Sequence, residues 1–189
     1  MVKYWFTADT HFGHSNIIKY CNRPFQTIEE HDSYLIRIWN SRVKPEDVVF
    51  HLGDFCFKKL KGKTAQFYLD QLNGKIIVVK GNHDSNNGVK TCIKNMRIHL
   101  GGKELLLIHK PEDVGYTDVD LVLCGHVHQH WKFRRFSVDF CNVGVDQWKF
   151  MPVTINEILR QYNKWLKTES LERGEKFIKE NYANIIDET

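Results

Sequence analysis

Five short apolar runs of this 189-residue chain end in side chains that can bind metals or transfer protons. The run from Ile76 to Val79 has the β-branched character of a strand that is buried on both faces. Gly81 lets the backbone turn there, and the residues at 82–84 are Asn, His and Asp. These residue types are also common in turns, so this stretch alone leaves an ordinary turn open. The recurrence along the chain favours a site built at the ends of strands.

Four other apolar runs end in the same way. They lead into Asp9 and His11, into Gly53 and Asp54, into His109, and into His126 and His128. Between the first strands, Thr27 and Glu30 form a capping box for a helix that reaches about Val43, and residues 64–72 predict another helix. Strands separated by helices favour a largely parallel sheet, with ligand sites at the carboxyl ends of its strands.

The second half of the sequence predicts antiparallel pairing and a helical end. Gly101-Gly102 is a two-residue hairpin signal between strands at 96–100 and 103–109. Further strands are expected at 121–124, 133–136 and 138–143. Thr154 and Glu157 predict the start of a C-terminal helical segment over about 155–181, in which the charged part from 169 is a peripheral helix. We expect a single domain over residues 1–189, since this length supports one well-buried core.

Composition limits the environment and the partners. A net charge of +4 permits an anionic substrate but lacks the dense basic stripe of most nucleic-acid binders. The five cysteines are scattered without a C-x-x-C pair, which argues against a disulfide framework and a zinc-thiolate site. No apolar run approaches the roughly 20 residues that span a bilayer. We therefore expect a cytoplasmic protein without a membrane partner; its oligomeric state is left open.

The residues at the strand ends form a set of nitrogen and oxygen ligands. If the backbone stays extended, the i, i+2 spacing puts Asp9 and His11 on one side, and likewise His126 and His128. Such a set suits manganese first, with iron, zinc, cobalt or nickel as alternatives, better than calcium or magnesium. The candidates are too many for one ion. Two divalent ions about 3.5–4 Å apart, bridged by a carboxylate, would activate a water for attack at phosphorus.

The chain resembles the calcineurin-like metallophosphoesterase family in five sequence blocks. In order along the chain they are D-x-H, G-D, G-N-H-D, a lone H and G-H-x-H. They cover residues 9–128, about two-thirds of the chain. The stretches D-T-H-F-G-H-x-N-I-I, C-N-R-P-F and N-V-G-V-D-x-W are similar to the small phage and bacterial branch. The resemblance implies an α/β fold, a four-layer αββα sandwich of two mixed β-sheets flanked by helices.

The resemblance also implies a role for each matching residue. One metal ion is expected on Asp9, His11, Asp54 and His128, and the other on Asp54, Asn82, His109 and His126. His83 is implied as the proton donor near the leaving group, supported by Asp84. His109 is followed by Lys110-Pro111 where many members of the family have glycine, so the rim of the second site departs from the family pattern.

Residues outside the matching blocks are candidates for substrate contacts. His14, Asn22 and Arg23 lie in the loop beside the first block, and we expect Arg23 or His14 to contact substrate phosphate. Arginine suits this role because its planar fork binds phosphate through two hydrogen bonds. A basic rim of Lys58, Lys59, Lys61, Lys63, Lys132, Arg134 and Arg135 is the alternative to plain solvated loops.

These features predict a metal-dependent phosphoesterase. A phosphodiesterase acting on nucleotides or other small diesters is favoured, with water attack and with His83 as the general acid. The chain has little length left for a capping domain, which argues for an open site. A nuclease or phosphomonoesterase of the same fold is the alternative within the class. A non-catalytic binding scaffold is the alternative outside it, although retention of His83 argues against that.

Overall fold

The computed structural model describes residues 1–57 and 62–182. The chain divides into two compact units, Met1–Ile155 and Asn156–Thr189. The single domain expected over residues 1–189 stays a prediction. The first unit carries every candidate site residue.

The first sheet is largely parallel, as the sequence predicts. It has the strand order β3-β2-β1-β9. The strands are β1 (Tyr4–Thr7), β2 (Val48–His51), β3 (Lys75–Val78) and β9 (Val153–Thr154). Strands β1, β2 and β3 pair in parallel, and β9 pairs antiparallel to β1. The carboxyl ends of three neighbouring strands therefore meet at one edge.

The second sheet is mixed and has the order β4-β5-β6-β8-β7. Its strands are β4 (Asn95–Leu100), β5 (Lys103–Ile108), β6 (Leu121–Cys124), β7 (Phe133–Arg135) and β8 (Asp139–Asn142). The predicted hairpin joins β4 to β5, and Gly101 and Gly102 have φ of 64° and 71°, as a type I′ turn needs. Strands β5, β6 and β8 run parallel, so β5 and β6 end at the same edge.

Two of the helices, those that follow Thr27 and Thr154, begin where the capping signals of the sequence place them. They are α1 (Ser15–Tyr20), α2 (Ile28–Asn40), α3 (Ala65–Leu69) and α4 (Ile155–Tyr182), with short 3-10 turns η1 (Asp84–Asn87), η2 (Pro111–Asp113) and η3 (Val145–Gln147). Thr27 accepts a hydrogen bond from the Glu30 amide, and Thr64 caps α3 in the same way. The segment α4 is one continuous helix where the sequence predicts two parts.

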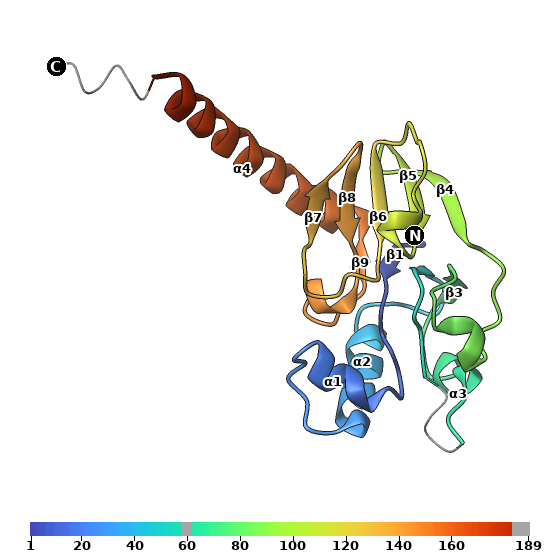
Figure 1. The fold of residues 1–189 in the computed structure, drawn as a ribbon. Coiled ribbons are helices and arrows are strands. Elements are labelled where there is room, and N and C mark those ends of the chain that lie inside the picture. The colour runs from blue at the N-terminus through green and yellow to red at the C-terminus, as the bar shows by residue number, and fades with distance from the viewer. Residues whose placement is uncertain (58–61, 183–189) are drawn as a thin grey trace. The chain divides into compact units, whose positions relative to one another are not determined.

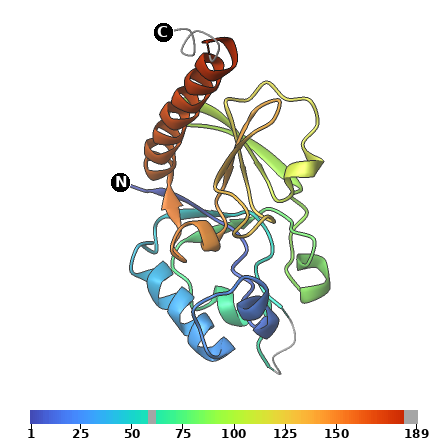
Figure 2. The same cartoon turned by 60° about the vertical axis from the view of Figure 1, so that its left-hand side comes forward.

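Two mixed sheets and four α-helices over the described residues confirm the predicted fold class. In both views α1 and α2 lie on one side of β1 and β2, and the second sheet lies on the other (Figure 1, Figure 2). None of the helices in the described ranges combines the length and the apolar character that crossing a membrane requires.

Alternation along β1 and β2 explains this layering. Trp5 and Val49 are buried in one cluster with Leu35 and Trp39 of α2 and with Tyr68 of α3. The next residue along each strand points the other way, and the rings of Phe6 and Phe50 stack there with centroids 5.5 Å apart. Each such buried large side chain contributes about 1.5–3 kcal/mol, so the strand ends that carry the site are held by a packed core.

Candidate metal centre

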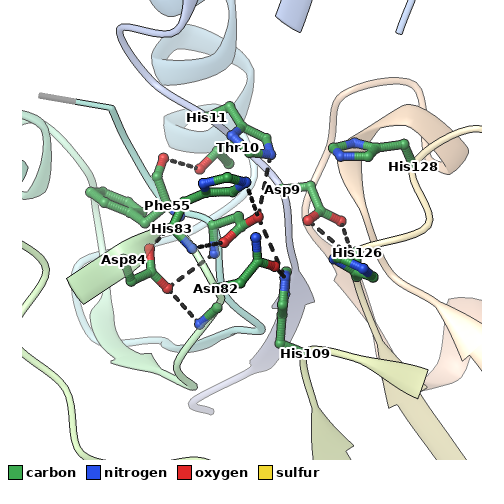
Figure 3. A network of polar contacts seen from close by, with 12 residues as sticks. Asp9, Thr10, His11, Phe55, Asn82, His83, Asp84, His109, His126 and His128 are labelled. Carbon is green, nitrogen blue, oxygen red and sulfur yellow. Dashed lines mark hydrogen bonds and ion pairs between the residues drawn. The ribbon is translucent and has the colours of Figure 1, made fainter. Parts of the chain in front are cut away.

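The loops that follow β1 and β2 are joined by backbone hydrogen bonds. The amide of Asp9 donates to the carbonyl of Gly53 (3.0 Å), and the amide of His11 donates to that of Asp54 (3.0 Å). The Asp9 carboxylate in turn accepts the amide of His126 at 3.0 and 3.1 Å. Because His126 follows β6, this contact connects the ends of the two sheets, as Figure 3 shows.

The ligand loops have left-handed backbone rather than extended backbone. Positive φ angles occur at Asp9 (56°), His11 (50°), Asp54 (55°), His126 (70°) and His128 (44°). The prediction that the two i, i+2 pairs project from extended strands is therefore wrong. Such conformations cost about 1–3 kcal/mol each outside glycine and persist where the surrounding structure enforces them, often at functional sites.

The structure brings the predicted metal ligands together in two groups. They are Asp9, His11 and His128, and Asp54, His109 and His126; within each group one ligand atom from every residue lies within 4.8 Å of the others. The Oδ2 atom of Asp54 lies 3.7 Å from Nε2 of His11 and 3.4 Å from Nε2 of His109. Asp54 therefore stands between the two groups. Asn82 belongs to the second, since its Oδ1 lies 3.0 Å from Nε2 of His109.

Hydrogen bonds to the second ring nitrogen orient two of the histidines. Nδ1 of His109 lies 2.7 Å from the carbonyl of Leu52, which can only accept, so Nδ1 carries a hydrogen and Nε2 is the nitrogen that faces the ligand group. Nδ1 of His128 lies 3.1 Å from a carboxylate oxygen of Asp146. Metal-binding histidines in proteins usually have such an outer partner.

The residues present fit divalent cations. Both ring nitrogens of His11 are buried without a hydrogen-bond partner among the described residues, although an unpaired buried nitrogen is costly. An ion between Asp9, His11 and His128 would satisfy Nε2 and neutralise the carboxylate. The donor set of imidazole, carboxylate and amide suits manganese, iron, zinc and related ions.

Burial and neighbouring charges shift the pKa values of Asp9 and Asp54 in opposite directions. Burial raises the pKa of Asp9 to about 6, against the opposing effect of His109 and His128. Burial also acts on Asp54, but the hydrogen bond and positive charge of His109 outweigh it and hold the pKa of Asp54 well below its usual value. Asp54 is thus a permanent anion at the centre of the site.

The pKa values of the four histidines are also shifted in two opposite directions. Burial lowers the pKa of His11 and His126, so both are neutral at pH 7, as metal ligands must be. Burial also disfavours the charged form of His109, yet the Asp54 carboxylate raises its pKa to about 9. In His128 the carboxylate of Asp146 outweighs burial and raises the pKa to about 10. Metal binding at His109 and His128 would release the second proton that each ring carries in the metal-free protein.

His83 lies at the open side of the centre. Its side chain is 44% exposed, and Nε2 lies 4.0 Å from Oδ2 of Asp54. Its amide donates to Oδ1 of Asp54 at 3.0 Å. The residue has helical backbone angles, φ −91° and ψ −18°. The Asp84 carboxylate accepts backbone amides of Gly81 (2.7 Å), Phe55 (2.9 Å) and Asp54 (3.0 Å), and in this way ties the loops of β2 and β3 together.

The three candidate substrate residues are placed very differently. His14 lies beside the centre, with its ring centroid 5.4 Å from that of His11. Asn22 is exposed in the turn after α1 and has a φ of 46°. Arg23 is buried, and its five N–H groups all donate to protein acceptors. Arg23 therefore has no donor left for substrate phosphate in this conformation, which corrects the expectation.

The predicted basic rim is only partly described. Lys58, Lys59 and Lys61 lie outside the described residues. Lys63 lies over the ring of Phe67, Lys132 over that of Trp148 and Arg134 over that of Phe136. Arg135 pairs with Asp139. These four basic residues therefore contact neighbouring side chains, as charged residues of loops and strands commonly do.

Sequence reasoning missed one residue of the centre, Asp146. Its carboxylate contacts His128 and Arg23. The signal was present, because Asp146 is the aspartate of the N-V-G-V-D-x-W stretch and Arg23 is the arginine of C-N-R-P-F. Neither stretch has a spacing that predicts a contact between them.

Comparison with known proteins identifies the family of this chain. Residues 3–156 match the calcineurin-like phosphoesterase superfamily domain. An uncharacterized protein of Methanocaldococcus jannaschii is 37% identical over 169 residues, which cover 87% of this chain and 93% of that protein. The gene 66 protein of Mycobacterium phage L5 is 35% identical over 76% of this chain and 86% of its own length.

A solved structure shows a similar fold. The crystal structure of a protein of unknown function from Aquifex aeolicus superposes with a TM-score of 0.67 at 25% identity, covering 85% of this chain and all of that one. The chain belongs to the calcineurin-like phosphoesterase superfamily, whose members are metal-dependent phosphoesterases.

Proposed function

We propose that this protein is a phosphodiesterase that works with two divalent ions, most simply manganese. The observation that carries the proposal is the position of Asp54, whose buried carboxylate lies between two groups of histidine and aspartate ligands. Ions bound at these groups would polarise the phosphoryl oxygens of the substrate and would lower the pKa of a bound water to about 7. The cytoplasmic location expected from the sequence stays a prediction.

His83 supplies the proton for the leaving oxygen in this proposal. Its half-exposed ring stands beside the ligand groups, where substrate can reach it, and its backbone amide is held by Asp54. Asp84 sets the loop around His83 through the backbone amides it accepts. A positioned general acid of this kind contributes typically a factor of about 10² to 10⁴.

A cavity beside the first ligand group supports a nucleotide-like substrate. It has a volume of about 470 Å³, and its lining includes His11, His83 and His128 together with the rings of His14, Tyr20 and Phe57. The rings of His14 and Phe57 stack with centroids 4.0 Å apart. Flat aromatic side chains next to a phosphate site suit a nucleobase, which stacks on them for about 1–3 kcal/mol.

A second cavity favours a nuclease as the alternative. It has a volume of about 420 Å³, lies against Asn82 and His109, and is lined by Lys80, Lys94 and Lys110. Three ammonium groups beside the second ligand group suit further phosphates of a longer strand. Lys110 lies 3.9 Å from Glu112, whose carboxylate offsets part of this positive charge.

The test is turnover by metal-free protein to which manganese is returned. We expect release of nitrophenolate from bis(4-nitrophenyl) phosphate to depend on manganese and to exceed release from 4-nitrophenyl phosphate. A dinucleotide and single-stranded DNA, compared under the same conditions, separate the phosphodiesterase from the nuclease. A preference for the monoester would make the protein a phosphomonoesterase, and no turnover of any ester would favour the binding scaffold.

A further inference from the structure

Arg23 and Asp146 lie 123 residues apart in the sequence and form a buried ion pair. Nε of Arg23 donates to Oδ1 of Asp146 at 2.8 Å, and a terminal nitrogen donates to Oδ2 at 2.9 Å. The two side chains are 0% and 4% exposed. Paired in this two-pronged way, both charges are compensated without water, and the planes of the two groups are fixed relative to each other.

The other N–H groups of Arg23 hold the loop that carries the first ligands. One terminal nitrogen donates to the carbonyl of Asp9 at 2.8 Å. The other donates to the carbonyl of Thr10 at 3.2 Å and to Nε2 of His31 at 2.8 Å. Arg23 thus binds the backbone where Asp9 has its positive φ of 56°. The guanidinium satisfies carbonyl groups that this unusual turn leaves inside the protein.

Asp146 extends the same contact to a ligand side chain. Its Oδ2 atom accepts from Nδ1 of His128 at 3.1 Å while it also accepts from Arg23. Since Asp146 holds Nδ1, Nε2 is the nitrogen that His128 has left for a metal ion in the group with Asp9 and His11. The pair therefore touches two of the three members of this group, one through its backbone and one through its ring.

Helix α2 supports the pair from behind. An arginine N–H can only donate, so Nε2 of His31 accepts and its Nδ1 donates to Asp32 at 2.9 Å. Asp32 also accepts the hydroxyl of Tyr68 at 2.8 Å and the amide of Gly13. A continuous line of buried hydrogen bonds thus runs from α3 through α2 to Arg23.

We propose that the Arg23–Asp146 ion pair is the positioning element of the Asp9–His11–His128 group, which it shapes to bind one divalent ion without itself contacting substrate. The inference rests on the proposed metal centre. Outer partners of this kind are worth about 10–100-fold in metal affinity. The geometry also requires arginine, because the three N–H donors of lysine cannot replace the five hydrogen bonds that reach both oxygens of Asp146, two carbonyls and His31.

The experiment is calorimetric titration of metal-free protein with Mn²⁺, combined with thermal unfolding of the same metal-free samples. The variants are Asp146→Asn, which keeps the size of the side chain, and Arg23→Lys. Arg135→Lys is the matched control, because Arg135 forms a similar two-pronged pair with Asp139 at the start of β8, with one hydrogen bond of 2.7 Å.

We expect wild type to bind two ions. Asp146→Asn and Arg23→Lys should each weaken one of them by about 10–100-fold and leave the other within roughly twofold, whereas Arg135→Lys changes neither. Wild-type affinity at both sites in Asp146→Asn would overturn the proposal, as would an equal loss at both sites. Asp146→Asn decides the question if Arg23→Lys does not fold.

The titration separates this inference from the proposed function. If wild type binds a single ion and Asp146→Asn weakens it, the positioning role stands and the dinuclear centre is wrong. If both ions bind as expected but Asp146→Asn has no effect, the centre stands and the positioning role is wrong.

Discussion

Asp54 is the residue on which both ligand groups depend. It is 2% exposed, and its Oδ2 atom faces His11 on one side and His109 on the other. Asp9, by contrast, faces one group and uses its carboxylate to hold the amide of His126. The two aspartates follow similar strands, but the contacts of their oxygens give them different roles.

The first prediction follows from this difference. Asp54→Ala should lose both metal ions, and Asp9→Ala should lose mainly one, because only Asp54 lies within reach of both groups. Elemental analysis of the purified variants measures the loss, with wild type as the reference. Two tightly held ions per chain in Asp54→Ala would show that Asp54 is not the bridge.

The second prediction concerns His83, which completes neither ligand group. His83→Ala should keep both metals and lose about 10² to 10⁴ in turnover on a nucleoside-type diester, whose leaving alkoxide needs a proton. On a nitrophenyl ester the loss should be much smaller, because the phenolate leaves without one. Turnover numbers on both substrates, with metal content determined in parallel, make the comparison. Equal losses would mean that His83 positions phosphate or water.

At the scale of elements, the ends of β2 and β3 are in direct contact through Gly81. A Cβ atom at Gly81 would collide with the amide and the carboxylate of Asp54. The Gly81 amide also donates to Asp84 at 2.7 Å. The glycine is therefore required by the close approach of two loops.

The third prediction is that Gly81→Ala destabilises the fold by about 1–3 kcal/mol and weakens metal binding, since the added methyl group displaces Asp54. Gly115→Ala is the matched control, because nothing lies within 4 Å of a Cβ there. Chemical denaturation and manganese titration of both variants test this. Wild-type stability and affinity in Gly81→Ala would contradict it.

Asp47 joins the start of β1 to the turn before β2. Its carboxylate accepts the amides of Lys3 (2.8 Å) and Lys44 (3.0 Å) and the indole N–H of Trp5 (2.9 Å). Burial acts to raise the pKa of Asp47, but these donated hydrogen bonds outweigh it and lower the pKa below its ordinary value. A carboxylate whose pKa is lower in the folded state stabilises the fold at pH values above its pKa in the unfolded chain, about 3.9. This stabilisation is lost as the pH falls through the lower pKa of the folded state.

The fourth prediction is that Asp47→Asn loses about 1–3 kcal/mol at pH 7, because its amide cannot accept all three donors. The difference from wild type should shrink as pH falls below about 4. Urea unfolding from pH 3 to pH 7 measures it, with the exposed Asp118→Asn as a control that changes little. A difference that grows toward low pH would reverse the sign of the argument.

At the scale of the whole first unit, the candidate metal centre takes residues from the ends of both sheets. One group takes His126 from the end of β6 with Asp54 from the end of β2, and the other takes His128 with Asp9 from the end of β1. Ions bound between the sheets stabilise the native state by mass action.

The fifth prediction is that a chelator lowers the melting temperature. An ion present at 100 times its dissociation constant stabilises by about 2.7 kcal/mol, which for a chain of this size corresponds to roughly 5–10 °C. Added manganese should restore the value. Asp54→Ala is the control, since its melting temperature should not respond to chelator. An unchanged melting temperature in wild type would contradict a centre that joins the sheets.

Much of the candidate site was predictable because local sequence patterns indicate its strands and the residues that follow them. Apolar runs of strand length predicted β1, β2, β3, β5 and β6, and the residues after them include all those that form the two ligand groups. Capping residues predicted where α2 and α4 begin. Such signals depend on neighbours within a few residues, so one strand or one helix turn is enough to express them.

Only the tertiary structure decided what depends on distant contacts. Left-handed backbone at Asp9 and His128 replaced the extended geometry predicted from their spacing, because neighbouring loops enforce it. The sequence predicts Arg23 as a substrate contact, whereas the structure pairs it with Asp146. No local pattern predicts a contact between residues 123 positions apart. The direction of a side chain depends on which acceptors the folded chain brings near it, and that information is absent from any single stretch of the sequence.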